Sequence, residues 1–126
     1  MKGKLKKVLV VEDNMETQLL IKVALRNEYE IQIVNGAEEA ILMLSKNQFE
    51  LVLLDLNLNG QGNGKSILKN IREEMHNTEL PVIITTAYDL SLEDKKYFEE
   101  YANGFVQKPF DKKILLNSIK QILVKN

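Results

Sequence analysis

Short apolar runs alternate with longer stretches of helical periodicity along the whole chain. Apolar runs of strand length that are separated by helical stretches are typical of successive β-α units on a parallel sheet. The runs predict five strands, at residues 7–12, 31–34, 51–55, 82–86 and 105–107. We therefore expect an α/β fold with a doubly wound parallel sheet in the common order 2-1-3-4-5, flanked by five helices.

The stretches between and after these strands carry apolar residues at helical spacing, which predicts the five helices. In the first helix, the stripe that we expect to face the sheet consists of Met15, Leu19, Leu20, Val23 and Ala24. The stripes of the other helices are Ala37, Ala40, Ile41 and Leu44; Ile67, Leu68 and Ile71; Phe98, Tyr101 and Ala102; and Ile114, Leu115, Ile119, Ile122 and Leu123. Residues suited to caps and turns are Asp13 or Asn14, Ser91 and Asp111 as N-caps, and Gly36, Gly64 and Gly104 in turns.

Composition limits the class of protein. A chain of 126 residues with 44% hydrophobic content fits a single domain, which we expect to span residues 1–126 with its core at about 7–123. The 17 basic and 18 acidic residues give a net charge of -1, which argues against direct nucleic-acid binding. The chain has no cysteine, which excludes disulfides, thiol catalysis and thiolate metal sites.

The apolar runs also bear on location. Runs of about four residues are far too short for a helix that crosses a membrane, so we expect no membrane insertion and a cytoplasmic location. Met1 and the charged ending Lys125–Asn126 favour a free-standing protein over a piece of a hybrid kinase or of a transcription factor.

Acidic residues stand where the first and third strands end. Glu12 and Asp13 follow the first apolar run, and Asp55 ends the third. In the order 2-1-3-4-5 these two strands are neighbours at the point where the chain reverses direction, and ligands bind outside the carboxyl ends there. Each pair of like charges about 4 Å apart costs on the order of 4 kcal/mol at an effective dielectric near 20. A cation such as Mg2+ would offset that repulsion, with a further oxygen from the backbone of Leu56 or Asn57.

A lysine and a threonine end the strands on the other flank. Lys108 provides a mobile positive charge for phosphate oxygens, and Thr86 provides a hydroxyl donor. A carboxylate such as Asp55 can attack a phosphoryl group and form an aspartyl phosphate. Phosphoryl transfer needs mainly positioning and charge neutralisation, and Mg2+ with Lys108 would supply most of both.

At these residues the chain resembles the receiver domain of two-component response regulators, of which the chemotaxis response regulator is a single-domain example. The resemblance covers nearly the whole chain, about residues 7–123, and rests on four motifs in the right order and spacing. They are VLVVEDN at 8–14, LLDLNL at 53–58, PVIITTA at 81–87 and FVQKPF at 105–110.

The resemblance implies a phosphoacceptor role in a phosphorelay. Asp55 is expected to receive a phosphoryl group from a phosphohistidine on a sensor histidine kinase or a histidine phosphotransfer protein. Mg2+, or Mn2+ in its place, is expected to bind directly to Asp13, Asp55 and the backbone carbonyl of Asn57, with Glu12 acting through water. The chain would then be a signalling domain that assists its own phosphorylation, and not a turnover enzyme.

The resemblance also implies a switch. The lysine matching Lys108 pairs with phosphoryl oxygens, and its bond to Pro109 is expected to be cis. Thr86 is expected to move toward the phosphoryl group while Phe105, a core residue, swings inward behind it. The result would be a repacked surface on the fourth helix, fifth strand and fifth helix, where an output partner docks.

Some positions depart from the family pattern. The first acid is Glu12 in place of the commoner aspartate, and Phe105 replaces a frequent tyrosine, so its inward state would depend on packing alone. The loop at 58–64 lacks the proline often found there. The positions expected to tune the lifetime of the acyl phosphate are Asn59, Ala87 and Tyr88.

Other interpretations remain open. Glu12 and Asp13 could merely cap the first helix. An aspartate-nucleophile phosphatase similar to the haloacid dehalogenases would need a second acid at the position of Asn57, and asparagine cannot act as a general acid or base. A receiver-like interaction module that is never phosphorylated, or a flavodoxin-like cofactor binder, is a third possibility; the latter lacks its phosphate loop after the first strand.

Overall fold

A computed structural model describes residues 5–58, 64–87 and 90–125 of the chain, and its strands form one parallel sheet. The strands are β1 (Lys6–Val11), β2 (Tyr29–Val34), β3 (Leu51–Asp55), β4 (Val82–Thr86) and β5 (Gly104–Gln107). Their order is β2-β1-β3-β4-β5, which confirms the predicted fold class. The bounds of β3 and β4 are as predicted, and the other strands begin one or two residues earlier than expected.

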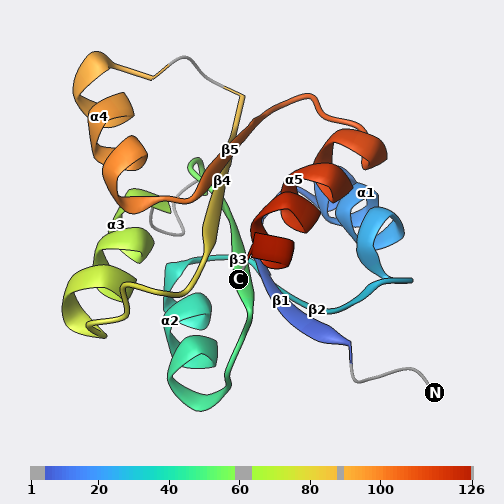
Figure 1. The fold of residues 1–126 in the computed structure, drawn as a ribbon, viewed down its shortest axis with the longest axis horizontal. Helices are drawn as coiled ribbons and strands as arrows, with labels where there is room; N and C mark the ends of the chain where they lie inside the picture. The colour runs from blue at the N-terminus through green and yellow to red at the C-terminus, as the bar shows by residue number, and fades with distance from the viewer. Residues whose placement is uncertain (1–4, 59–63, 88–89, 126) are drawn as a thin grey trace.

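Helices cover both faces of this sheet (Figure 1). They are α1 (Met15–Leu25), α2 (Ala37–Lys46), α3 (Gly64–Lys69), which continues as the π-helix η1 (Asn70–Glu74), α4 (Leu92–Tyr101) and α5 (Lys112–Lys125). Helices α1 and α5 lie on one side of the sheet, and α2, α3 and α4 lie on the other (Figure 1). Within residues 5–58, 64–87 and 90–125, no helix has both the length and the apolar character needed to cross a bilayer.

Each face of the sheet has its own hydrophobic core. Along β1, Val8 and Val10 pack toward α1 and α5, whereas Leu9 and Val11 pack toward the opposite helices. This packing on both faces is what a strand covered on both sides requires, and it explains why β1 is apolar over its last four residues and β3 over its first four.

The predicted core stripe of the first helix is wrong for four of its five residues, and only Ala24 is buried. Met15 and Leu19 are 81% and 63% exposed, and Leu20 and Val23 are exposed as well. The buried side chains of α1 are Ile21, Ala24 and Leu25. Because α1 carries apolar residues on most of its circumference, helical periodicity fits more than one face, and packing against β1 and α5 selects the one with Ile21 and Leu25.

The later helices follow their predicted stripes more closely. All three predicted core residues of α3 and η1 are fully buried: Ile67, Leu68 and Ile71. In α5 the buried residues are Leu115, Ile119 and Leu123, but Ile114 in the first turn is half exposed. Tyr101, at the end of α4, is also partly exposed. Gly104 is the first residue of β5 and does not lie in a turn, and a Cβ there would lie 3.0 Å from the Ile122 side chain.

Candidate functional site

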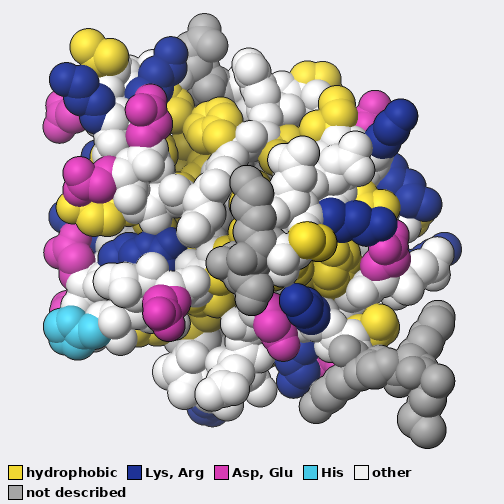
Figure 2. Space-filling model, viewed as in Figure 1, with side chains coloured by type: hydrophobic (Ala, Val, Ile, Leu, Met, Phe, Trp, Pro, Cys, Tyr) yellow, Lys and Arg dark blue, Asp and Glu magenta, His cyan; other side chains and the backbone are white. Residues whose placement is uncertain are grey.

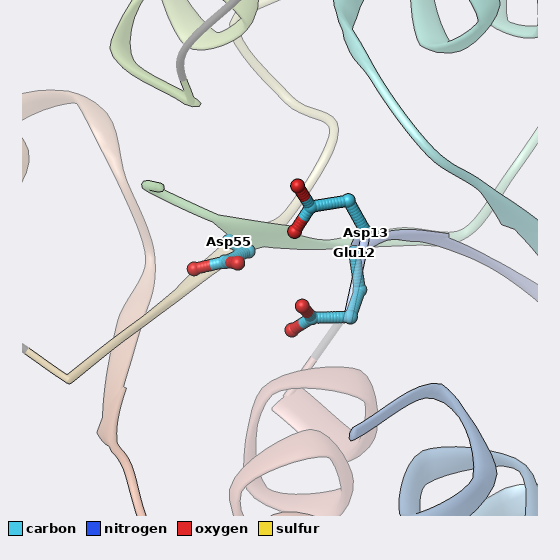
Figure 3. A group of neighbouring side chains, drawn as sticks. All are labelled: Glu12, Asp13 and Asp55. Carbon is cyan, nitrogen blue, oxygen red and sulfur yellow. The ribbon is translucent and has the colours of Figure 1, made fainter. Parts of the chain in front are cut away.

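Three carboxylates meet at the carboxyl ends of β1 and β3 (Figure 3). The two strands are paired, with Val11 opposite Leu54, so the residues that follow β1 lie beside Asp55 at the end of β3. One oxygen each from Glu12, Asp13 and Asp55 lies within 4.8 Å of the others. Glu12 and Asp55 are only 1% and 3% exposed. This edge of the sheet therefore concentrates negative charge in a place that water screens poorly.

The start of α1 leaves Asp13 out of the helix cap. Asn14 is the N-cap, and its side-chain oxygen accepts a hydrogen bond from the Thr17 N–H at 2.9 Å. The Asn14 N–H donates to Oε2 of Glu12 at 3.0 Å. The cap is thus filled by Asn14, and the Asp13 carboxylate lies with the other two acids instead.

Gln18 is a residue that the sequence pattern did not single out. Its Nε2 donates to the backbone carbonyl of Glu12 at 2.6 Å and to Oδ1 of Asn35 at 2.8 Å. These bonds connect α1 to the segments that follow β1 and β2, and so fix the backbone that carries two of the three acids. A polar residue one helical turn after an N-cap has too many possible partners for sequence alone to assign this role.

Lys108 brings a positive charge from β5 to the acids. Its Nζ lies 2.8 Å from Oε1 of Glu12 and 3.3 Å from Oδ2 of Asp55. Its backbone N–H donates to the carbonyl of Thr86 at 2.8 Å, and the peptide bond to Pro109 is cis.

The ionisation of this pair follows from burial and contact. Burial raises the pKa of Glu12, and the hydrogen bonds from Lys108 and from the Asn14 N–H only partly offset it. Burial alone would lower the pKa of Lys108, but its contacts with Glu12 and Asp55 outweigh burial and raise that pKa. The contacts between the two groups thus favour the charged form of Lys108, whereas burial disfavours the charged form of Glu12.

The backbone after Asp55 is tightly held. The Asn57 N–H donates to Oδ1 of Asp55 at 3.2 Å, and the Gly64 N–H donates to the Leu56 carbonyl at 3.3 Å. A Cβ on Gly64 would lie 2.6 Å from the Asp55 carbonyl oxygen and 2.9 Å from the Leu56 Cα. Such distances are too short for any side chain, so the close approach of these two segments requires glycine.

The donor set fits a hard divalent cation. Three carboxylates supply oxygen ligands, and one lysine neutralises only part of their charge. Mg2+ prefers oxygen ligands and commonly uses one or two carboxylates together with water and phosphate oxygens. The chemistry of Glu12, Asp13 and Asp55 therefore matches the expected metal, and Asn57 lies next to them on the exposed side.

Thr86 and Phe105 lie on the flank of β4 and β5. Thr86 is fully buried at the end of β4, one residue after the partner of Asp55 in the strand register. Phe105, expected in the core, is 47% exposed, so that prediction is wrong. The reason is that β5 is the edge strand of the sheet and α4 does not close over it.

An open hollow of about 640 Å3 separates α4 from β5. Apolar side chains line it, among them Leu90, Phe98 and Phe105, with Lys95 and Glu99 also contributing. Figure 2 shows hydrophobic side chains between α4 and the centre of this face, with charged groups along the outer side of α4.

The remaining predicted site positions lie further from the acids or outside the described part of the chain. Ala87 follows β4 and is exposed. Asn59 and Tyr88 lie outside the described residues, as does most of the 58–64 loop.

A second polar cluster, at the opposite edge of the sheet, centres on Arg72 in η1. Its guanidinium donates to the backbone carbonyls of Tyr101, Asn77 and Leu80 at 2.9 to 3.0 Å, and to Oδ1 of Asn103 at 3.1 Å. These bonds join the end of α4 to the segments that enter β4 and β5. Sequence analysis missed this cluster entirely.

Comparison with known proteins places the chain in a family. A family model described as the response regulator receiver domain matches residues 8–120. The chain is 34% identical over 118 residues to the sensory transduction protein LytT of Bacillus anthracis, covering 91% of this chain and 46% of that protein. It is 30% identical over 120 residues to the transcriptional regulatory protein PcoR of Escherichia coli, covering 94% of this chain and 52% of that protein.

The chain thus spans about half the length of the curated relatives that it matches. Among solved structures, a CheY-like response regulator receiver domain protein from Methanospirillum hungatei superimposes with a TM-score of 0.86 at 27% identity, covering 97% of this chain and 96% of that one. The family model matches most of the chain and the fold is shared with solved receiver domains, so the chain belongs to the response regulator receiver domain family.

Proposed function

We propose that Asp55 is the phosphoacceptor of a two-component phosphorelay and receives its phosphoryl group from a phosphohistidine on a sensor histidine kinase or a histidine phosphotransfer protein. The observation that carries the proposal is the position of the Asp55 carboxylate, which lies beside Glu12 and Asp13 on one side and 3.3 Å from the Lys108 ammonium on the other. Asp55 thus has carboxylates that can bind a cation on one flank and a positively charged ammonium group on the other.

The chemical step is a displacement at phosphorus. A carboxylate oxygen of Asp55 forms the new bond to phosphorus while the phosphorus–nitrogen bond to the histidine breaks, and its electron pair stays on the imidazole nitrogen. Lys108 stabilises the negative charge on the phosphoryl oxygens, and the Asn57 N–H holds the second carboxylate oxygen in place.

In this proposal Asp13, Asp55 and the Asn57 backbone carbonyl would hold Mg2+ directly, and Glu12 would hold it through water. When bound, Mg2+, or Mn2+ in its place, supplies charge neutralisation for the phosphoryl group. The chain makes a single covalent change per signal, and it acts as a signalling domain and not as a turnover enzyme.

The proposed output is a change of surface on α4, β5 and α5. Thr86 follows Thr85, the register partner of Asp55 in the sheet, and Phe105 borders the hollow between β5 and α4. A hydroxyl drawn toward the phosphoryl group leaves room behind it, and inward rotation of Phe105 would fill that room. Because the aromatic ring is 47% exposed, this rotation would alter the surface that an output partner contacts.

Intact mass measurement tests the proposal. Incubation with Mg2+ and acetyl phosphate is expected to add one phosphoryl group to the wild-type chain and none to Asp55→Asn. Asp94→Asn, an aspartate of α4 that pairs with Lys65, is the matched control and should gain the group normally. A mass gain that persists in Asp55→Asn would overturn the assignment.

Two other results would point to other classes of protein. Sustained hydrolysis of unrelated phosphate esters would indicate a phosphatase with an aspartate nucleophile. No modification together with no Mg2+ affinity would indicate a receiver-like interaction module.

A further inference from the structure

Helix α4 has little apolar contact with the rest of the domain. Among the residues of α4, which the structure describes in full, only Phe98 is buried, and an open hollow separates the helix from β5. At its last turn, the Arg72 guanidinium donates to the Tyr101 carbonyl. At its first turn, Nζ of Lys65 lies 2.8 Å from Oδ1 of Asp94. The position of α4 therefore depends strongly on polar contacts with α3 and η1.

The side chain of Lys65 connects α4 to the end of β3. Lys65 directly follows Gly64, whose backbone lies so close to β3 that a Cβ there would be 2.6 Å from the Asp55 carbonyl oxygen. The Lys65 ammonium lies beside Asp94 and 4.9 Å from the ring centroid of Tyr97. Residues three apart in a helix share a face, so the ammonium contacts one face of α4. Helices α3 and α4 lie on the same side of the sheet (Figure 1).

The Tyr97 hydroxyl disfavours the same position of α4. Its ring lies edge-on to Phe98 and next to Tyr101. Within the described part of the chain, the hydroxyl oxygen is buried and has no hydrogen-bond partner. A buried polar group without a partner costs free energy, which contact with water would recover. The contact with Lys65 and the buried hydroxyl thus act on α4 with opposite signs.

We infer that Lys65 is a latch that holds the first turn of α4 against α3, and that α4 moves away from α3 when the contact between Lys65 and Asp94 opens. In the open position the Tyr97 hydroxyl reaches water. Because α4 borders the hollow that Phe105 also lines, opening changes the shape of the surface on α4 and β5. The consequence for an output partner rests on the proposed function, whereas the latch itself does not.

Hydrogen exchange of the α4 amides tests the latch, because the rate of exchange reports local opening. Lys65→Met and Asp94→Asn are each expected to speed α4 exchange about two- to fivefold relative to the amides of α5, as is typical of the loss of a partly exposed ion pair. The double variant should exchange no faster than the faster single variant, because both substitutions open the same contact.

Two variants serve as matched controls. Glu93→Gln removes the neighbouring acid of the same helical turn, which attracts Lys65 less than Asp94 does, and should speed α4 exchange less than Asp94→Asn. Lys120→Met breaks an ion pair of similar length, with Glu28 at 2.9 Å, and should leave α4 exchange unchanged. The inference is overturned if Lys65→Met has no effect, if α5 speeds up equally, or if the two effects multiply in the double variant.

Tyr97→Phe should give a change of the opposite sign. It keeps the ring and removes the hydroxyl, and is expected to slow α4 exchange about twofold or more. Faster exchange in this variant would contradict the inference, because it would mean that the hydroxyl stabilises the present position of α4.

Salt provides a measurement on the unaltered chain. Raising NaCl from about 0.05 to 1 M screens exposed charges and should speed α4 exchange relative to α5. The same increase should have little effect in Lys65→Met. An equal response of the two chains would contradict the latch.

Phosphoryl addition separates the latch from the proposed function. Lys65→Met and Asp94→Asn should each gain one phosphoryl group on Asp55, because neither residue belongs to the carboxylate cluster. If the wild type gained no phosphoryl group, the proposed function would fall and the latch would stand. If α4 exchange were unchanged in Lys65→Met, the latch alone would fall.

Discussion

Two basic side chains, the buried Arg72 and the partly buried Lys108, lie at opposite ends of the strands of the same sheet and are held by different kinds of oxygen. Arg72, at the edge where β4 and β5 begin, donates to three backbone carbonyls and one side-chain amide. Lys108, at the edge where β5 ends, lies between the carboxylates of Glu12 and Asp55.

The difference is between dipoles and charges. A guanidinium has several N–H donors that point in fixed directions, and the oxygens around Arg72 match those directions. A metal ion or an ammonium group is too compact to contact all of these oxygens at once. Carboxylates attract any cation that fits, and a lysine ammonium is a compact point charge on a flexible stem. The oxygens around Arg72 are therefore suited to fixing the fold. The carboxylates around Lys108 are suited to exchanging one cation for another.

The largest expected effect is at the Arg72 edge. Arg72→Met removes the donor to three backbone carbonyls and is expected to lower the free energy of unfolding by about 2–4 kcal/mol, with no recovery on addition of Mg2+. Urea unfolding followed by circular dichroism measures it. Arg26→Met, at the exposed end of α1, should change stability by no more than about 0.5 kcal/mol.

A smaller and reversible effect is expected at the other edge. Without metal, Lys108→Met should lower the free energy of unfolding by about 1–2 kcal/mol, because Glu12 and Asp55 lose their compensating cation. Mg2+ should restore this variant, and should stabilise it more than the wild type. If Mg2+ stabilised Lys108→Met and the wild type equally in the same unfolding experiment, the proposed difference between the surroundings of Lys108 and those of Arg72 would be wrong.

The smallest effect has the opposite sign. Asp13→Asn reduces like-charge repulsion and is expected to stabilise the metal-free chain by about 0.5–1 kcal/mol while weakening Mg2+ binding. Thermal unfolding with and without Mg2+ measures both. Glu16→Gln, an exposed acid in the first turn of α1, should give no such gain, because it loses a favourable interaction with the helix dipole.

The sequence predicted the layout of the sheet well, because strands buried on both faces are apolar throughout and end abruptly at polar residues. The boundaries of β3 and β4 and the approach of Glu12, Asp13 and Asp55 all follow from that pattern. The sequence pattern failed for a helix in which more than one face carries apolar residues at helical spacing. In α1, Leu19 and Ile21 are equally apolar, and only packing decides which of them is buried.

The two cation contacts were beyond sequence reasoning for different reasons. Arg72 binds mostly backbone carbonyls, which every residue carries and which leave no signature in the chain. The bond from Lys108 to Glu12 joins residues 96 positions apart and depends on the length of one side chain. Residue types at strand ends predict which groups lie in the same region of the sheet, but not which of them form a hydrogen bond with one another.

Gly64 has a consequence for how this chain can vary. A Cβ there would collide with backbone atoms of Asp55 and Leu56, so no flexible neighbour can move aside to accommodate it. Every other amino acid carries that atom. No other residue can therefore replace Gly64 unless the end of β3 moves. A substitution that moves the end of β3 also moves Asp55, on which the proposed chemistry depends.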